Sequence, residues 1–133
     1  MAYLKPPWFP RKVFNPLASR FGIGHAEKLT VAGRTSGQPR SVPVVSVDVG
    51  GSRYLVSARG ETEWVRNVRK AGRVELARRG SPQQRFATTE VPAQDSTPII
   101  AAYRQKAGRA VAPLWKKLPD NADHPTFRLT PTS

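Results

Sequence analysis

Two adjacent glycines between two β-branched stretches constrain the fold of this chain more than any other feature. Gly50 and Gly51 can take the positive φ angles of a two-residue hairpin turn between strands at 45–49 and 53–58. Similar stretches predict strands at 28–32, 41–48, 73–80, 85–93 and 125–131. Because hairpin-linked strands dominate, we expect a mainly β (α+β) fold: a small barrel of about six antiparallel strands with two or three helices packed outside it.

Two helices are expected between the strands. Residues 62–71 place apolar side chains on one helical face, with Thr62 to cap the start and Gly72 to end the helix. Residues 97–107 carry a second apolar stripe, which includes Tyr103.

The first 24 residues form a separate arm that is rich in proline, aromatic and basic residues. A short helix is expected at 13–21 within this arm, and residues 25–133 would form the single barrel domain. Trp8 and Phe9 would either cap one end of the core or rest on a membrane surface, as basic amphipathic segments can. Prolines break the apolar stretch that a signal peptide needs, and no run of about 18 apolar residues occurs, so we expect a cytoplasmic protein.

Cysteine is absent and the chain has only two histidines, His25 and His124, which narrows its chemistry. Without thiolates or two histidines at ligand spacing, no metal site is expected. The formal net charge of +13 favours anionic partners: nucleic acid, anionic lipid, or a small ligand with several phosphates or carboxylates.

The segment GRTSGQPR, residues 33–40, joins the first two predicted strands and combines the groups that bind phosphate. Its glycines free the backbone to point amide groups at an anion, and Thr35 and Ser36 add hydroxyl donors. Arg34 and Arg40 add planar guanidinium groups that suit a phosphate. An ordinary basic turn uses the same residue types, so the loop alone leaves both interpretations open.

A second polar group follows the hairpin, where Arg59 precedes the helix that carries Trp64 and Asn67. Free amide groups at the start of a helix favour an anion, and residues three apart on a helix can face one place. Trp64 taken singly is more typical of a core residue. Three basic residues of this helix are expected on its solvated face: Arg66, Arg69 and Lys70.

Together, the segments LTVAGRTSGQPRSVPV and YLVSARGETEWVRNVRKAGRVEL resemble the two signature segments of the deazaflavin-dependent nitroreductase family. These actinobacterial oxidoreductases use coenzyme F420, an 8-hydroxy-5-deazaflavin. The similarity covers residues 29–76 well and continues weakly to the C-terminus. It implies a split β-barrel and transfer of a hydride from the reduced coenzyme, chemistry that belongs mainly to the cofactor and needs no catalytic acid or nucleophile on the protein.

The resemblance also implies which residues bind the coenzyme. The loop would hold the phosphate and the start of the oligoglutamate tail, residues 42–45 and 56–59 would line the ring, and the helix would close the site. The cofactor-binding residues expected on this basis are Arg34, Thr35, Ser36, Gly37, Arg40, Ser41, Val42, Pro43, Val44, Val45, Val56, Ser57, Ala58, Arg59, Glu63, Trp64 and Asn67.

The acceptor pocket departs from the family pattern. Nitroimidazole-reducing members place a tyrosine near Val45 and a serine near Ala58, whereas this chain has apolar residues there. Val45, Ala58 and Tyr103 are the expected substrate contacts, although Tyr103 would equally suit helix packing. We expect a hydrophobic conjugated acceptor: a quinone, an enone or, less readily, a nitroaromatic.

Other functions stay open at this level. A small basic barrel can bind single-stranded nucleic acid, but few aromatic residues fall on the predicted strands, so nucleic acid is not the expected partner. A related barrel could bind the coenzyme, a flavin or haem without turnover. FMN is less expected, since its single phosphate uses few of the arginines. The sequence is compatible with a monomer or a homodimer.

Overall fold

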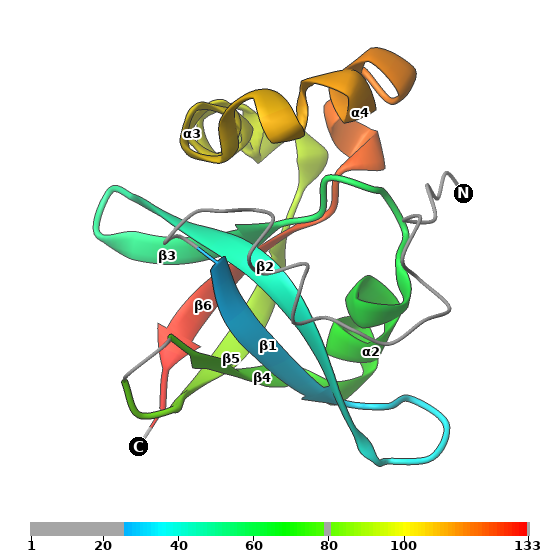
Figure 1. Cartoon of the computed structure of the whole chain (residues 1–133), viewed down its shortest axis with the longest axis vertical. Coiled ribbons are helices and arrows are strands. Elements are labelled where there is room, and N and C mark those ends of the chain that lie inside the picture. Colours follow the sequence, from blue (N-terminus) through cyan, green and yellow to red (C-terminus); the bar gives the residue numbers. More distant parts are fainter. Residues whose placement is uncertain (1–25, 79–80, 133) are drawn as a thin grey trace.

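The computed structural model describes residues 26–78 and 81–132, which form a closed barrel of six antiparallel strands (Figure 1). The strand order is β1–β2–β3–β6–β5–β4, and β4 pairs with β1 to close the barrel. The expected antiparallel barrel is therefore confirmed. The N-terminal arm, its expected helix and His25 lie outside the described residues. The strands are β1 (Ala26–Ala32), β2 (Pro39–Val49), β3 (Ser52–Val56), β4 (Arg73–Ala77), β5 (Gln84–Val91) and β6 (Thr126–Pro131).

The β2–β3 hairpin turns at the predicted pair of glycines. Gly50 and Gly51 have φ angles of 59° and 84°, and Val49 pairs with Ser52 across the turn. Both central residues of this turn need positive φ, which glycine adopts without steric cost. Strand β3 ends at Val56, two residues before its predicted end, so Ser57 and Ala58 belong to the connection that leads to the next helix.

Three α-helices lie outside the barrel in the described part of the chain. α2 (Glu63–Ala71) begins where the Thr62 hydroxyl accepts a hydrogen bond from the Val65 amide, and it ends at Gly72, with φ of 71°. α3 (Thr97–Ala107) has the bounds that the sequence predicts. α4 (Ala112–Lys117) is not predicted, because six residues are too few to show a helical period. None of the described helices is long and apolar enough to cross a membrane.

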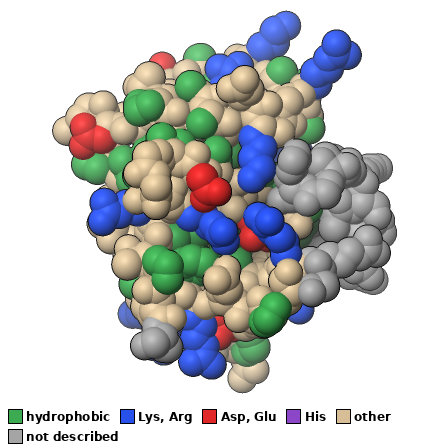
Figure 2. All heavy atoms as spheres, turned by 90° about the vertical axis from the view of Figure 1, so that its left-hand side faces the viewer, with side chains coloured by type: hydrophobic (Ala, Val, Ile, Leu, Met, Phe, Trp, Pro, Cys, Tyr) green, Lys and Arg blue, Asp and Glu red, His purple; other side chains and the backbone are tan. Residues whose placement is uncertain are grey.

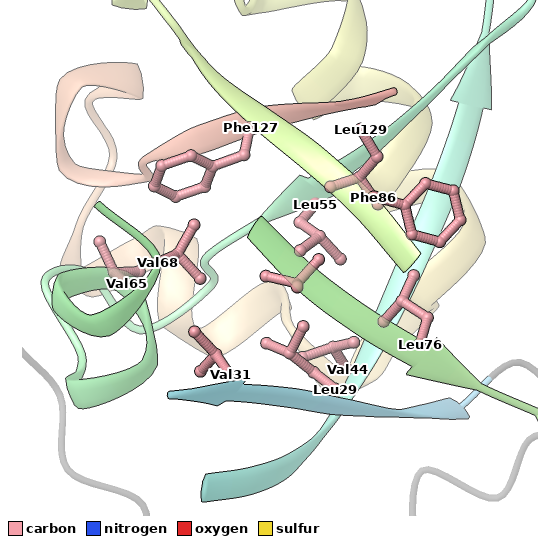
Figure 3. Close-up of a cluster of buried hydrophobic side chains, with 11 residues drawn as sticks. Leu29, Val31, Val44, Leu55, Val65, Val68, Leu76, Phe86, Phe127 and Leu129 are labelled. Atoms are coloured by element: carbon pink, nitrogen blue, oxygen red, sulfur yellow. The ribbon is translucent and has the colours of Figure 1, made fainter. Parts of the chain in front are cut away.

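One apolar cluster fills the barrel interior (Figure 3). Leu29 and Leu55 point into it from β1 and β3 and are fully buried. Val65 and Val68 enter it from α2, which therefore closes one end of the barrel. Burying a side chain of this size stabilises the fold by roughly 1.5–3 kcal/mol. The other members are Val31, Val44, Val74, Leu76, Phe86, Phe127 and Leu129.

A second apolar cluster lies between β2 and β3 and the helices α3 and α4 (Figure 1). Val45 belongs to this outer cluster whereas Val44 belongs to the inner one, because successive side chains of a strand point to opposite faces. Strand β2 is thus buried on both faces, as its loose alternation predicts. The outer cluster consists of Val45, Val47, Val56, Ile99, Ile100, Tyr103, Val111 and Trp115.

Strands β2 and β3 pair along only part of β2. Ser46–Val49 pairs with Ser52–Leu55, whereas residues 39–45 pair with β1 on the other side. Over residues 41–45, β2 therefore has an edge without a strand partner in the described structure. Such an edge presents backbone donors and acceptors to a neighbouring group.

Candidate functional site

Arg34 is anchored to helix α2 by three contacts. Its backbone amide and its Nη1 donate to Asn67 Oδ1 at 3.0 and 2.9 Å, and Nη1 lies 2.8 Å from Glu63 Oε1. Asn67 is buried, while the side chains of Arg34 and Glu63 are 34% and 47% exposed. The β1–β2 loop and the first turns of α2, which are distant in sequence, thus meet at one place and hold a guanidinium group at the surface.

The β1–β2 loop is closed by its own backbone. The Gly33 amide donates to the Gln38 carbonyl at 2.8 Å, and the Gly37 amide, where φ is 76°, donates to the Gly33 carbonyl at 2.9 Å. The Gln38 amide donates to Ser36 Oγ at 3.1 Å. These three amides are therefore used within the loop, and the Arg34 amide is bound to Asn67. The anion cradle that the sequence suggests stays a prediction for the amides of Thr35 and Ser36, together with the side chains of the loop.

Arg40 folds back over the same loop. A Cβ atom built on Gly33 would lie 3.4 Å from Arg40 Nε and 3.4 Å from Ser36 Oγ. The lack of a side chain at Gly33 is what allows this close approach. Arg34 and Arg40 therefore flank one loop, on which Thr35 and Ser36 are exposed.

The residues expected along the ring divide between the two faces of the sheet. Val42 packs partly buried against the inner cluster, as does Trp64, whose ring centroid lies 6.2 Å from that of Phe127. Ser41, on the other face, contacts Thr30 through a 3.0 Å hydroxyl pair. The other residues expected to line the ring also fall on both faces. Val44 belongs to the inner cluster, Val45, Val56 and Ala58 belong to the outer cluster, and Pro43 is half-buried.

Tyr103 lies in the outer cluster with Val45 and Ala58, so the three expected substrate residues share one region. Burial raises the pKa of the Tyr103 hydroxyl above its usual range, and the positive charge of Arg59 offsets part of that rise. Arg59 is therefore close enough to act on Tyr103. The Ser57 hydroxyl is buried and donates to the Gly60 carbonyl at 2.6 Å, so it is committed to the connection before α2.

Residues 11–117 match a family model described as F420H2-dependent quinone reductase. The match spans the β1–β2 loop, α2, α3 and α4. The chain belongs to this family. The resemblance that the two signature segments indicate is thus confirmed. No curated protein matches the sequence.

Several solved structures share the fold of this member of the F420H2-dependent quinone reductase family, although their sequence identity to it is low. One, described as an F420-H2 dependent reductase, has 19% identity and a TM-score of 0.58, over 79% of this chain and 93% of its own. The haem storage protein HutZ from Vibrio cholerae has 15% identity and a TM-score of 0.58, over 92% of each chain. A third, described as a domain-swapped dimer, has 19% identity and a TM-score of 0.59, over 79% of each chain. At these identities, the likeness shows the fold alone.

Arg69 lies on the exposed face of α2, as expected, and it holds this helix to the barrel. Its Nη1 and Nη2 donate to the two carboxylate oxygens of Glu61 at 2.5 and 2.9 Å. Its Nε and Nη2 donate to Glu90 of β5 at 2.9 and 2.8 Å. These hydrogen bonds raise the pKa of Arg69. The helical pattern gives no signal for this contact, because Glu90 is 21 residues away on another element.

His124 is a buried residue to which the sequence assigns no role. Its Nδ1 lies 2.9 Å from the Ser57 carbonyl, and its Nε2 lies 2.6 Å from the Leu118 carbonyl. The imidazole stacks on Trp115, with centroids 3.8 Å apart. The ring thereby links the connection before α2 to the end of α4. A lone histidine in a loop-like segment carries no sequence signal for this linkage.

Proposed function

We propose that the chain binds coenzyme F420 beside β2 and transfers a hydride from its reduced form to a hydrophobic conjugated acceptor. The anchoring of Arg34 by Asn67 and Glu63, within the segment that matches the family, is the observation that carries this proposal. An arginine held by a buried amide loses less conformational freedom on binding an anion than a free surface arginine would.

The acidic part of the coenzyme would bind at the β1–β2 loop. Arg34 and Arg40 flank this loop, and the exposed hydroxyls of Thr35 and Ser36 lie between them in sequence. Guanidinium and hydroxyl donors are the groups that bind phosphate and carboxylate oxygens. The formal net charge of +13 would raise the local concentration of such a ligand. These residues therefore fit the phosphate and the oligoglutamate tail of the coenzyme, which together form its acidic handle.

The ring would lie where β2 separates from β3. The unpartnered edge of β2 over residues 41–45 offers backbone hydrogen bonds, and the connection 56–59 lies on the other side of the separation. Trp64 and Val42 would exclude water from one side. Reduced deazaflavin supplies a hydride at one ring carbon, so the protein needs to orient that carbon and keep its face dry.

The acceptor would bind near the outer cluster. Val45, Ala58 and Tyr103 give this region an apolar character, and Tyr103 is 6% exposed. A quinone or an enone suits such a surface better than a charged acceptor does. We place nitroaromatic compounds last among the three classes, because Val45 and Ala58 stand where the nitroimidazole-reducing members have polar side chains.

Binding without turnover is the alternative function that the fold supports, since HutZ shares the fold and is a haem storage protein. Haem ligation by His124 is disfavoured, because both of its ring nitrogens already lie at hydrogen-bond distance from carbonyl oxygens. FMN has one phosphate and would use fewer of the arginines. We therefore favour F420 and an oxidoreductase.

We also propose a homodimer, which the domain-swapped dimer among the structural relatives supports, and a location in the cytoplasm. Peripheral membrane contact through the N-terminal arm remains a proposal about residues outside the described ones. Sedimentation with anionic vesicles tests it: a chain shortened by residues 1–24 should bind less than the full chain.

A panel of acceptors tests the proposed activity. F420H2 is mixed with the protein and, in separate reactions, with menadione, cyclohexenone or a nitroaromatic, and its oxidation is followed by absorbance. The proposal expects turnover that is fastest with the quinone. Tight binding of F420H2 without oxidation by any acceptor would establish a carrier instead.

A further inference from the structure

The end of the barrel opposite α2 carries a cavity of about 310 Å³ that is open to solvent on one side. The Gly50–Gly51 turn, the described part of the β4–β5 connection and the end of β6 all lie at this end, on the left in Figure 1. Figure 2 looks onto it and shows basic and acidic side chains interleaved around hydrophobic ones. The lining residues are Glu27, Arg53, Leu76, Arg78, Ser81, Pro82 and Gln84.

Glu27 is the buried charge beside this cavity. Its side chain is 3% exposed, and its Oε1 accepts a hydrogen bond from Ser46 Oγ at 2.5 Å. Its Oε2 lies 3.7 Å from Arg53 Nη1 and 3.5 Å from Arg78 Nε. The carboxylate is thus neutralised by two guanidinium groups without forming a hydrogen bond to either, since both distances exceed the usual range for such bonds.

Arg53 and Arg78 therefore bring more positive charge to the cavity than Glu27 offsets. The Arg53 guanidinium lies 5.6 Å from the centroid of the Phe86 ring, which limits its movement. In the described structure Arg53 also lies 3.6 Å from Asp48, but that carboxylate is 73% exposed and does not line the cavity. None of the ion pairs of Arg53 and Arg78 in the described structure is short enough for a hydrogen bond, so an anion in the cavity can compete for these guanidinium groups.

The rest of the lining limits the class of anion. Leu76 and Pro82 provide an apolar wall, while Ser81 and Gln84 add neutral polar groups. Among the described lining residues, two side chains are positively charged and one is negatively charged, so a ligand with a single negative charge balances them. A carboxylate matches the planar fork of a guanidinium group, and a short carbon chain matches the apolar wall.

We propose that this cavity binds a small aliphatic monocarboxylate between Arg53 and Arg78. The site lies at the other end of the barrel from the β1–β2 loop and does not depend on coenzyme binding there. Glu27 competes with the ligand for the two guanidinium groups, and it thereby sets the affinity to a low value.

The test is a titration of the ¹⁵N-labelled full chain with sodium butyrate, followed by the amide resonances of Leu76 and Gln84. We expect saturable shifts, and weakening of binding by about tenfold in Arg78→Gln, because a charge-assisted hydrogen bond is lost. Arg85→Gln is the matched control: it removes one exposed arginine outside the cavity and should leave butyrate binding unchanged.

Glu27→Gln gives the sharper result, because the amide keeps a hydrogen-bonding partner for Ser46 while the competing charge is lost. Butyrate should bind more tightly in this variant. The proposal would be overturned if butyrate gave no saturable shifts, or if uncharged butyramide gave equal ones. It would also be overturned if inorganic phosphate bound more tightly than butyrate, or if Glu27→Gln bound butyrate more weakly than the parent. Binding of F420 to Arg78→Gln measures the other site separately and should equal that of the parent.

Discussion

Asn67 Oδ1 accepts two hydrogen bonds from Arg34, one from the backbone amide at 3.0 Å and one from Nη1 at 2.9 Å. A single buried acceptor thus fixes both the backbone of the β1–β2 loop and the direction of its first arginine. We interpret Asn67 as a positioning residue for Arg34 rather than as a direct contact of the coenzyme, which is a more specific role than the sequence suggests.

Replacing Asn67 tests this positioning role. Asn67→Ala removes the acceptor for both donors, so we expect F420 affinity to fall about tenfold, with a loss of roughly 1–3 kcal/mol in the free energy of unfolding. Fluorescence titration and chemical denaturation measure the two effects. In Arg34→Ala, the further change Asn67→Ala should weaken F420 binding less than it does in the parent, because only the hydrogen bond from the backbone amide of residue 34 is left to lose. Additive losses in the double variant would contradict the positioning role.

The hydrogen bonds of Arg69 to Glu61 and Glu90, which we call the Arg69 clamp, should contribute to the stability of the fold. Arg69→Met leaves Glu61, which is 7% exposed, without its bidentate partner. We expect a loss of about 1–3 kcal/mol in the free energy of unfolding, less than for a fully buried pair because the Arg69 side chain is 35% exposed. Arg66→Met, on an exposed position of the same helix, is the control and should change stability by under about 0.5 kcal/mol. Equal losses in the two variants would refute the clamp.

The burial of the Tyr103 hydroxyl predicts how the free energy of unfolding responds to alkaline pH. Burial raises the pKa of its hydroxyl, so the folded state keeps the proton at pH values where the unfolded state, with a tyrosine pKa of about 10, releases it. The unfolded state then binds fewer protons, and the free energy of unfolding falls as pH rises above about 10, by up to about 1.4 kcal/mol per pH unit. Denaturation of the parent and of Tyr103→Phe between pH 9 and 11 measures this slope. The variant should show the smaller slope, and equal slopes would show that Tyr103 ionises freely in the folded protein.

Local residue choices made part of the fold predictable. Gly50 and Gly51 specify a hairpin turn through their own backbone freedom, and Thr62 and Gly72 specify the two ends of α2. The antiparallel barrel follows from hairpin-linked strands, and the covered faces of β2 follow from its loose alternation. Such features depend on neighbours in sequence and need no knowledge of the tertiary structure.

Features that depend on distant partners could not be predicted. Arg69 meets Glu90 across 21 residues, and His124 meets the Ser57 carbonyl across 67 residues. α4 is short and depends on packing of Trp115 against the outer cluster rather than on a helical pattern. In the candidate site, the residue types of the loop indicate an anion, whereas the use of its amides within the loop becomes visible only in the structure.

The central claim is that Arg34 and Arg40 bind the acidic handle of the coenzyme. Fluorescence titration of F420 with the parent and with Arg34→Ala/Arg40→Ala tests it most directly. Arg73→Ala/Arg128→Ala is the matched control, since it removes two exposed arginines from the strands β4 and β6 and lowers the net charge equally. We predict tight binding by the parent and the control, and a loss of about a hundredfold or more in the test variant, as expected when two charge-assisted contacts are removed. Equal affinities in all three proteins, or equal losses in both variants, would contradict the account.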